Sequence, residues 1–405
     1  VKCAGDGRFV KVGKEQAAAE IAEKVIELIA RYGARSIATY TGTGATLYSA
    51  NPGMVIAWMR AIGSPMVFSA VTIDKPAAHI ANALHGNWMA GPHGFGSADT
   101  WLIVGANPII SKSNGLPNNN PGMRLKEAVR NGLKLIVIDP RQTETARHAQ
   151  IHLQVQPGED PTILAGLINV VITERLYDEA FVAAHVQSFD ELKRQVANFT
   201  PEYAAQRAGV PTGKLIEAAR VFGKGNRGFA VCSTGPSFAT HSNLSYYLSL
   251  CLSSICGRWA RAGEEAAWPN VLLPPFTPKA QAQPPYPAWG IGEPMRVRGL
   301  QMSASGMPTA ALADEILLDG DGQVRALFCM GGNPMMAWPD QRKTFAALRK
   351  LELLVAFDCE LSATAELAHY VIAPPLSLET PGMTHRIEWA KYMQPTRGLE
   401  QPWAQ

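Results

Sequence analysis

The sequence lacks several features that would assign a protein to a specialised class. Its 405 residues contain no amino-terminal signal peptide. They also contain no apolar run near the roughly 18 residues that a membrane-spanning helix needs. There is no block of lysine or arginine, and the formal net charge is only +3. We therefore expect no direct membrane insertion and no nucleic acid partner.

Cysteine motifs are missing as well. The chain has no Cys-x-x-Cys pair and no spacing typical of a zinc site, although it contains Cys3, Cys232, Cys251, Cys256, Cys329 and Cys359. We interpret these residues as ordinary buried thiols, which is the commonest state of free cysteine. Because the sequence begins with Val1 instead of methionine, we read it as a fragment. We expect a cytoplasmic location, with a periplasmic one left open.

What the chain does have is enough apolar sequence for a large core. Apolar residues make up 47% of the 405 residues, which is sufficient for two or three domains. The clearest local pattern runs from Asp99 to Arg141. Two apolar runs, at 101–104 and 133–138, flank a helical segment at 123–131. This pattern predicts a β-α-β unit of a parallel sheet that is covered on both faces.

Both predicted strands end in residues that suit a nucleotide. Gly105, Asn107 and Pro108 follow the first strand, and Asp139 and Arg141 follow the second. In such units ligands bind beyond the carboxyl ends of the strands, where backbone N–H groups and short polar side chains are available. Two simpler interpretations stay open, a helix cap for Asp139 and a surface ion pair for Arg141.

The same turn occurs twice. Gly-Ala-Asn-Pro at 105–108 recurs as Gly-Gly-Asn-Pro at 331–334, and each copy is followed by a helix and a strand that ends in aspartate. The first aspartate is Asp139 and the second is Asp358. Two turns with matching continuations predict two similar nucleotide sites in one chain.

Further elements follow the same alternation of strand and helix. Periodicity predicts helices at 15–30, 54–62, 162–172, 190–196, 212–221, 243–255 and 340–349, and strands at 36–40, 151–155, 228–232, 324–330, 353–357 and 370–373. Residues 67–76 are predicted to form a strand that runs into a polar turn. The turn at 41–44, which contains glycines 42 and 44, is either a candidate phosphate loop or a plain turn. Eight prolines between 268 and 294 indicate a segment without regular structure.

These pieces resemble, in their order and spacing, the molybdopterin oxidoreductases of the DMSO reductase family. The resemblance rests on the two Gly-x-Asn-Pro turns, on Asp139-Pro140-Arg141-Gln142-Thr143-Glu144-Thr145-Ala146, on Pro157-Gly158-Glu159-Asp160 and on Asp358 with residues 362–368. It implies two pseudo-symmetric, Rossmann-like α/β domains with mostly parallel sheets. It also implies a molybdenum or tungsten ion held by two molybdopterin guanine dinucleotides.

Carried over to this sequence, the resemblance implies two cofactor pockets. One pocket would consist of Gly105, Asn107, Pro108, Asp139, Arg141, Asp160, Thr234, Gly235, Pro236 and Ser237. The other would consist of Gly332, Asn333, Pro334, Asp358, Ser362 and Thr364. A carboxylate accepts paired hydrogen bonds from guanine N–H groups or from ribose hydroxyls, and glycine allows backbone amides to approach a pyrophosphate. Helix capping by Asp160 before Pro161 is the alternative interpretation.

The protein ligand of the metal would fall between Val71 and Pro76, by the spacing that the family shows. Asp74 is our candidate ligand because a carboxylate binds a high-valent metal, whereas isoleucine cannot coordinate. A strict register instead places Ile73 at the ligand position, and Asp74 would then act as a nearby acid or base. Lys75 would steer an anionic substrate or remain solvated, and each of the nearby His79, His85 and His93 is more often a structural group than a substrate contact.

Two departures from the family pattern are visible. The amino-terminal cysteines for a 4Fe-4S cluster are missing, and the carboxyl-terminal β-barrel domain would begin about where the chain stops. We therefore expect the central domains of a longer enzyme, with the cluster outside this segment. The first domain would combine residues 1–68 with 265–405, and the second would be 69–264; each would bind one pterin guanine dinucleotide.

The implied activity is a two-electron oxidation or reduction of a small substrate, with or without transfer of an oxygen atom. A redox partner protein or electron-transfer subunit is also expected. Two other classes stay open. One is a scaffold without molybdenum, resembling the large iron–sulphur subunit of respiratory complex I. The other is a non-redox hydratase with the same cofactor. The sequence does not identify the substrate, because loops outside these turns select it.

Overall fold

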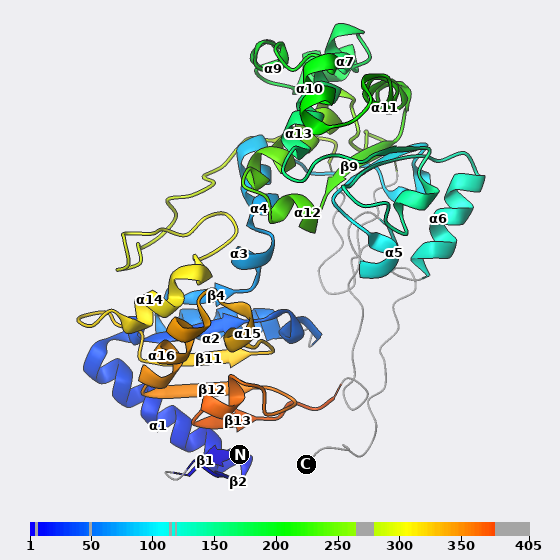
Figure 1. The fold of residues 1–405 in the computed structure, drawn as a ribbon. Helices are drawn as coiled ribbons and strands as arrows, with labels where there is room; N and C mark the ends of the chain where they lie inside the picture. Colours follow the sequence, from blue (N-terminus) through cyan, green and yellow to red (C-terminus); the bar gives the residue numbers. More distant parts are fainter. Residues whose placement is uncertain (5–6, 48–50, 113–115, 118–119, 265–278, 377–405) are drawn as a thin grey trace. The chain divides into compact units, whose positions relative to one another are not determined.

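The computed structural model describes residues 1–4, 7–47, 51–112, 116–117, 120–264 and 279–376. The described chain divides into two compact units (Figure 1). Unit 1 contains residues 1–74 and 289–376, and unit 2 contains the remaining described residues from Lys75 to Ala288. Among the described residues, no helix is both long and apolar enough to cross a membrane.

Unit 1 is a seven-stranded sheet in the order β2-β1-β13-β12-β11-β3-β4. The strands are β1 (Lys2–Cys3), β2 (Phe9–Val10), β3 (Ile37–Thr41), β4 (Val67–Ser69), β11 (Ala326–Met330), β12 (Leu353–Phe357) and β13 (Tyr370–Ile372). The five strands from β13 to β4 are parallel, and only β1 and β2 pair antiparallel. The chain therefore joins an amino-terminal and a carboxyl-terminal segment in one sheet.

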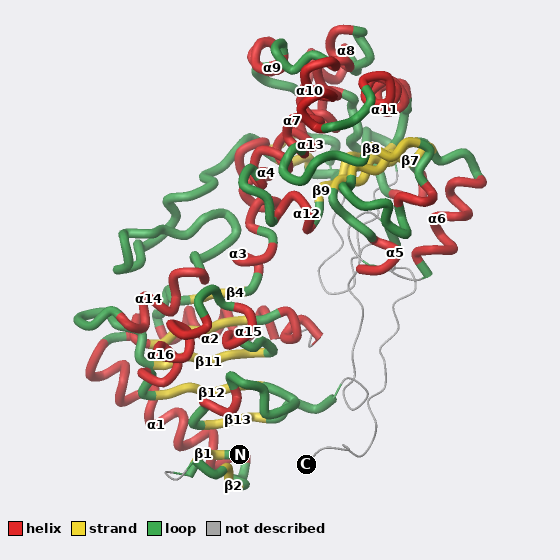
Figure 2. The backbone as a smooth tube through the Cα atoms, viewed as in Figure 1, coloured by secondary structure: helices red, strands yellow, loops and turns green. Residues whose placement is uncertain are grey.

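Helices cover both faces of this sheet (Figure 2). The longer ones are α1 (Lys14–Tyr32), α2 (Asn51–Ile62), α14 (Leu312–Leu317) and α16 (Gln341–Lys350), with short turns α3 (Val71–Asp74) and α15 (Pro334–Ala337). Along β11, Leu327 and Cys329 pack on the side of α14 and α16. Phe328 and Met330 pack on the opposite side, with α1 and α2. This alternation places the sheet in the middle of a three-layer unit.

Unit 2 is built around a four-stranded parallel sheet in the order β8-β7-β6-β9. Its strands are β6 (Thr100–Val104), β7 (Lys134–Ile138), β8 (Ile151–Leu153) and β9 (Gly228–Cys232), with a separate hairpin of β5 (Asn87–Trp88) and β10 (Ala282–Gln283). Its helices are α4 (Pro76–His85), α5 (Pro108–Ser111), α6 (Pro121–Arg130), α7 (Asp160–Thr173), α8 (Glu179–His185), α9 (Phe189–Val196), α10 (Pro201–Ala208), α11 (Thr212–Lys224), α12 (Thr234–Ser237) and α13 (Ser242–Ile255).

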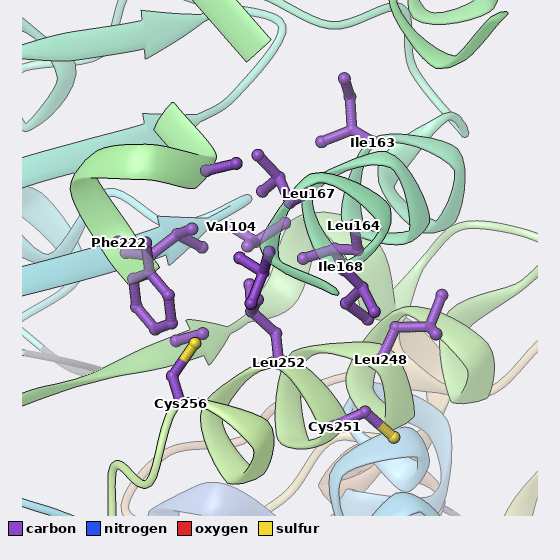
Figure 3. Packing of buried hydrophobic residues seen from close by; sticks show 14 of the residues in the cluster. Val104, Ile163, Leu164, Leu167, Ile168, Phe222, Leu248, Cys251, Leu252 and Cys256 are labelled. Atoms are coloured by element: carbon purple, nitrogen blue, oxygen red, sulfur yellow. The ribbon is translucent and has the colours of Figure 1, made fainter. Parts of the chain in front are cut away.

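The main core of unit 2 lies between its sheet and the helices α7, α11 and α13. Figure 3 shows Leu164, Leu167 and Ile168 of α7 packed toward Leu252 of α13, next to Val104 of β6. On the other face of the sheet, Trp101 and Ile103 of β6 pack in a second cluster with residues of α6. Helix α7 is buried along almost its whole length, because sheet and helices surround it.

The predicted α/β fold with two largely parallel sheets is confirmed. The order β8-β7-β6-β9 in unit 2 corresponds to β13-β12-β11-β3 in unit 1, so the strands that carry the two Gly-x-Asn-Pro turns are equivalent. Parallel strands end at the same edge of a sheet. In each unit the turn, the aspartate and a third strand end therefore lie side by side.

Three local predictions were wrong or incomplete. Residues 67–76 were predicted as a strand with a polar turn, but β4 ends at Ser69 and residues 71–74 form helix α3. Strand β4 stops because its partner β3 ends at Thr41. Helices α4, α8, α10 and α14 were not predicted. Within the described part of the proline-rich segment, Ala282 and Gln283 pair with β5; residues 265–278 lie outside the described chain.

Candidate dinucleotide sites at the strand ends

The turn after β6 is tightly constrained by its neighbours. Gly105 has a φ of 58°, and a Cβ at this position would lie 2.2 Å from Cδ of Pro236. The N–H of Gly105 donates to the Ile138 carbonyl at 2.8 Å, and its own carbonyl accepts from the N–H of Gly235 at 2.9 Å. Three strand ends of unit 2 therefore meet at Gly105, and only glycine fits there.

Unit 1 repeats this geometry with different residues. Gly331 has a φ of 56°, and a Cβ there would lie 2.2 Å from the nitrogen of Ala45. The N–H of Gly331 donates to the Phe357 carbonyl at 3.0 Å, and its carbonyl accepts from the N–H of Gly44 at 3.0 Å. The structural equivalent of Gly105 is thus Gly331, and Gly332 occupies the position of Ala106.

The asparagine of each turn is held by a threonine from the next loop. Oδ1 of Asn107 accepts from Oγ1 of Thr145 at 2.8 Å and from its N–H at 3.2 Å. Oδ1 of Asn333 accepts from Oγ1 of Thr364 at 2.7 Å. In both turns the same hydroxyl accepts the N–H that follows the proline, that of Ile109 or Met335. Pro108 and Pro334 are buried at the first position of the short helices α5 and α15.

Two carboxylates of unit 2 lie close enough to influence each other. Asp139 follows β7 and Asp160 begins α7, and their side chains are only 9% and 7% exposed. The carboxylate of Asp139 accepts the N–H of Arg141 at 2.8 Å. Burial raises the pKa of Asp139, and burial together with the charge of Asp139 raises the pKa of Asp160 to about 6. No described residue forms an ion pair with either carboxylate.

This pair offers buried acceptors that a donor-rich ligand could satisfy. Arg141 itself is exposed, and its Nη2 lies 3.8 Å from Oε2 of Glu144. The turn at 234–237 forms helix α12, in which Pro236 contacts Gly105 and Oγ of Ser237 bonds to the Ser233 carbonyl at 3.2 Å. All ten residues predicted for this pocket lie on the carboxyl edge of one sheet.

In unit 1, Asp358 occupies the position of Asp139. Its carboxylate accepts a hydrogen bond from Oγ of Ser362 at 2.7 Å and one from the N–H of Glu360 at 3.4 Å. Oγ of Ser362 in turn accepts the N–H of Ala365 at 3.3 Å, as Oγ1 of Thr143 accepts the N–H of Ala146 at 3.0 Å in unit 2. Hydrogen bonds therefore hold the loop that contains Asp358 and Ser362, and Thr364 ties this loop to Asn333 of the turn.

The predicted metal ligand lies on a short helix. Asp74 is the last residue of α3, is exposed, and forms no side-chain hydrogen bond with any described residue. Ile73 is partly buried and packs against the core of unit 1. Lys75 is partly exposed and precedes α4. Within the described chain, no group of three or more His, Cys, Asp or Glu side chains could hold a metal ion.

The histidines near Asp74 have mostly structural partners. His79 is exposed on α4. Nδ1 of His85 lies 2.9 Å from the Gly86 carbonyl, and its Nε2 lies 2.9 Å from Oγ of Ser254. Nε2 of His93 lies 3.1 Å from Oε2 of Glu264. Burial lowers the pKa of both His85 and His93, so these two imidazoles are neutral parts of the unit 2 framework.

Sequence reasoning missed several residues of these loops. Gly331 belongs to the second turn, and Thr145 and Glu144 bond to Asn107 of the first, but none of the three was among the predicted site residues. Gly44, which bonds to Gly331, was predicted only as part of a candidate phosphate loop or a plain turn. One signal could have identified Thr145: Thr-x-Thr-Ala at 143–146 recurs as Ser-x-Thr-Ala at 362–365. The contact between Gly44 and Gly331 joins residues far apart in the chain, and no local pattern encodes it.

Comparisons with known proteins agree on one family. A family model described as molybdopterin oxidoreductase matches residues 1–384. The acetylene hydratase of Syntrophotalea acetylenica is 28% identical over an alignment that covers 93% of this chain and 54% of that protein. The alpha subunit of an F420-dependent formate dehydrogenase from Methanocaldococcus jannaschii is 30% identical, covering 70% of this chain and 42% of that protein.

A solved structure shares the fold. The acetylene hydratase from Pelobacter acetylenicus superposes with a TM-score of 0.80 at 23% identity, covering 100% of this chain and 58% of that one.

Dimethyl sulfoxide reductase DmsA of Escherichia coli is 25% identical over 91% of this chain and 49% of its own length. The chain thus spans about half the length of the curated relatives it matches.

Proposed function

Since the chain belongs to the molybdopterin oxidoreductase family, we propose that it supplies the two central α/β units of a molybdenum or tungsten enzyme that moves two electrons to or from a small substrate. Each unit would bind one molybdopterin guanine dinucleotide. Such a cofactor supplies a metal that exchanges electrons with the substrate. A 4Fe-4S cluster and a redox partner would belong to parts of the enzyme outside this chain.

The observation that carries this proposal is the duplicated turn. In each unit a glycine with a positive φ, a buried proline and a threonine-held asparagine lie beside an aspartate at the carboxyl edge of a parallel sheet. A single turn of this kind would fit many α/β proteins. Two equivalent turns in equivalent strands favour a ligand that is bound twice.

The residues present fit a guanine dinucleotide. Asp139 and Asp160 are buried acceptors that form no ion pair with any described residue, and guanine offers N1–H and N2–H donors that would satisfy them. The absence of a Cβ at Gly105 and Gly331 lets Pro236 and Ala45 approach the two turns closely, so these glycines fix the strand ends beside which the ligand would lie. In unit 1, Asp358 and Ser362 offer the corresponding carboxylate and hydroxyl.

Asp74 would act at the reacting centre. Its exposed carboxylate has no partner among the described residues, so it is free to coordinate the metal or to exchange a proton with the substrate. Ile73 supplies only an apolar contact to the unit 1 core. Lys75, the next residue, would orient an anionic substrate.

A second candidate function is a non-redox hydration. It is favoured by the similarity to acetylene hydratase, which extends over 93% of this chain, whereas the formate dehydrogenase subunit matches 70%. In a hydratase the same residues would hold the cofactor. Asp74 would then move a proton during the addition of water to the substrate.

One assay separates the two functions. The full-length, metal-loaded protein is incubated with formate or acetylene, with and without a dye that accepts electrons. An enzyme that oxidises its substrate turns over only with this dye and reduces it, and one that reduces its substrate needs a reduced dye, which it oxidises. A hydratase forms product at the same rate without either dye. Absence of turnover with a wide set of oxidisable, reducible and hydratable molecules would contradict both.

A substitution tests the role of Asp74. Asp74→Ala is expected to lower kcat by about 100-fold or more, since general acid–base groups contribute on that order. A metal-ligand role predicts loss of bound metal as well, and an acid–base role predicts full metal content. The control is Asp321→Asn, an exposed carboxylate of unit 1 outside both turns, which should keep normal turnover. Equal rates for Asp74→Ala and the wild type would contradict a role of Asp74 in the reaction.

A further inference from the structure

Asn107 and Asn333 have matching partners at the oxygen of the side-chain amide and different ones at its nitrogen. At the oxygen, each accepts a hydrogen bond from a threonine hydroxyl, that of Thr145 or Thr364. On the nitrogen side, Nδ2 of Asn107 donates to Oε2 of Glu144 at 2.6 Å. Nδ2 of Asn333 has no partner among the described residues.

The difference comes from one residue of the repeated loop. Glu144 immediately precedes Thr145, and the residue that precedes Thr364 is Ala363. Because alanine has no side-chain acceptor, the loop of unit 1 lacks the group that holds the amide nitrogen of Asn107 in unit 2. The loop of unit 2 holds both ends of the Asn107 side chain and leaves only one of its two N–H bonds uncommitted.

Glu144 also brings a negative charge to the turn. Its own backbone N–H and the Asn107 amide lower the pKa of Glu144, so the side chain is ionised at neutral pH. Arg141 compensates this charge weakly, since Nη2 lies 3.8 Å from the carboxylate and the two side chains are 66% and 38% exposed. Asp139 and Asp160 already make this edge of unit 2 acidic.

We propose that Glu144 is a positioning residue that makes the two dinucleotide sites chemically unequal. It binds the Asn107 amide to the protein and places a carboxylate near the ligand, whereas Asn333 keeps both amide N–H bonds for the phosphate oxygens of its ligand. This inference rests on the proposed function. Its consequence is that unit 1 binds a phosphate-bearing guanine ligand more tightly than unit 2 does.

The physical reason is the sign of the groups that face the phosphates. A neutral amide that donates to a phosphate forms a charge-assisted hydrogen bond, which is stronger than a bond between two neutral groups. A carboxylate at the same turn repels the phosphate, and salt screens this repulsion. Unit 1 therefore gains a donor and unit 2 carries a repulsive charge.

Calorimetric titration of the full-length protein with guanosine diphosphate tests this. The protein is produced without cofactor in a host that cannot make molybdopterin, and its fold is checked by circular dichroism. The wild type should bind two equivalents with unequal affinity. Glu144→Gln keeps an acceptor for Asn107 but removes the charge, so it should tighten the weaker site by about fivefold at low salt and less at high salt.

The chain itself offers the reciprocal variant. Ala363→Glu places a carboxylate beside Asn333 and should weaken the tighter site about tenfold, the effect of losing one hydrogen bond to a charged group. The control is Glu127→Gln, an exposed position on α6, which should change neither site.

The outcomes separate the two proposals. Two sites of equal affinity, or unchanged affinities in both Glu144→Gln and Ala363→Glu, would overturn the unequal-site inference and leave the proposed cofactor function standing. Failure of the folded wild type to bind any guanosine diphosphate would overturn both. An affinity change in the opposite direction in either variant would also contradict the role assigned to Glu144.

Discussion

At the scale of single residues, the carboxylates Asp139 and Asp160 are the most informative feature of unit 2. Both are buried; burial raises the pKa of Asp139, and burial together with the charge of Asp139 raises the pKa of Asp160. Among the described residues neither carboxylate forms an ion pair, and two buried like charges that are not paired do not stabilise a fold. Such a pair is therefore better explained by a ligand with several N–H donors than by the needs of the fold.

The raised pKa of Asp160 gives a prediction about stability and pH. The pKa rises from 3.8 to about 6, so the native state binds the proton more tightly than the unfolded state does. This contribution is fully present below about pH 4 and is lost as the pH rises through about 6. Asp160→Asn should therefore raise the free energy of unfolding by up to about 3 kcal/mol at pH 8 and change it little at pH 4.

The measurement is the urea midpoint of the cofactor-free protein between pH 4 and pH 8. Asp321→Asn, an exposed carboxylate in unit 1, is the control and should leave the pH profile unchanged. An Asp160→Asn variant that is less stable than the wild type at pH 8 would show that the carboxylate has a partner which stabilises its charge.

Some of these residues could be predicted from the sequence and others could not. Asp139, Asn107 and Asp358 follow apolar runs directly, so their position at strand ends was visible in the chain. Glu144 could not be selected, because its role depends on a hydrogen bond to Asn107 across 37 residues. The electrostatic effect of Asp139 on Asp160 likewise depends on the tertiary fold, because the two residues are far apart in the sequence.

At the scale of elements, each candidate site is assembled by three strand ends. In unit 2 the glycine after β6 hydrogen-bonds to the end of β7 and to the turn after β9, and in unit 1 the glycine after β11 does the same with β12 and the turn after β3. The spacing between these strands leaves no room for a side chain. The turn is therefore rigid in both units before any ligand binds.

Glycine substitutions test this rigidity. Gly105→Ala and Gly331→Ala should each lower the free energy of unfolding by roughly 3 kcal/mol, because a Cβ meets a neighbour and the backbone φ is positive. Gly132→Ala is a matched control, since Gly132 has a φ of 99° and open space around it. It should cost only about 1 kcal/mol, the cost of the backbone conformation alone.

Thermal or urea unfolding of the three variants measures the difference. Equal losses for Gly105→Ala and Gly132→Ala would mean that the turn adapts to a side chain and is not fixed by the strands around it.

The sequence predicted most strands because buried parallel strands are continuous apolar runs. It failed where an element depends on a partner. Strand β4 is short because β3 offers only three paired residues to it, from Thr39 to Thr41. Helix α4 was missed because alanines fill several of its buried positions and weaken the apolar pattern, and it is stabilised by packing in the unit 2 core.

At the scale of the whole molecule, the described chain consists of two units with separate cores. The core residues of unit 2 form two clusters, one on each face of its sheet, and all of them lie between Ala77 and Ala260. Unit 1 depends on two distant segments, because β3 pairs with β11 and β1 pairs with β13. The predicted pairing of one cofactor with each half of the chain stays a prediction.

This organisation predicts how fragments behave. Residues 75–288 produced alone should fold and unfold cooperatively in urea, because the four strands of the unit 2 sheet and its core helices are all included. Residues 1–74 alone should not fold, since β3 lacks its partner β11. Circular dichroism and urea titration of both fragments check this, and a folded 1–74 fragment or an unfolded 75–288 fragment would contradict it.

The central claim is that two equivalent turns hold two guanine-containing pterins around one metal ion. The most direct test is the metal and nucleotide content of the intact protein, purified without harsh treatment. The account predicts molybdenum or tungsten at one ion per chain and two guanine nucleotides per ion after acid hydrolysis. Intact protein that contains neither metal and releases no guanine nucleotide would contradict it.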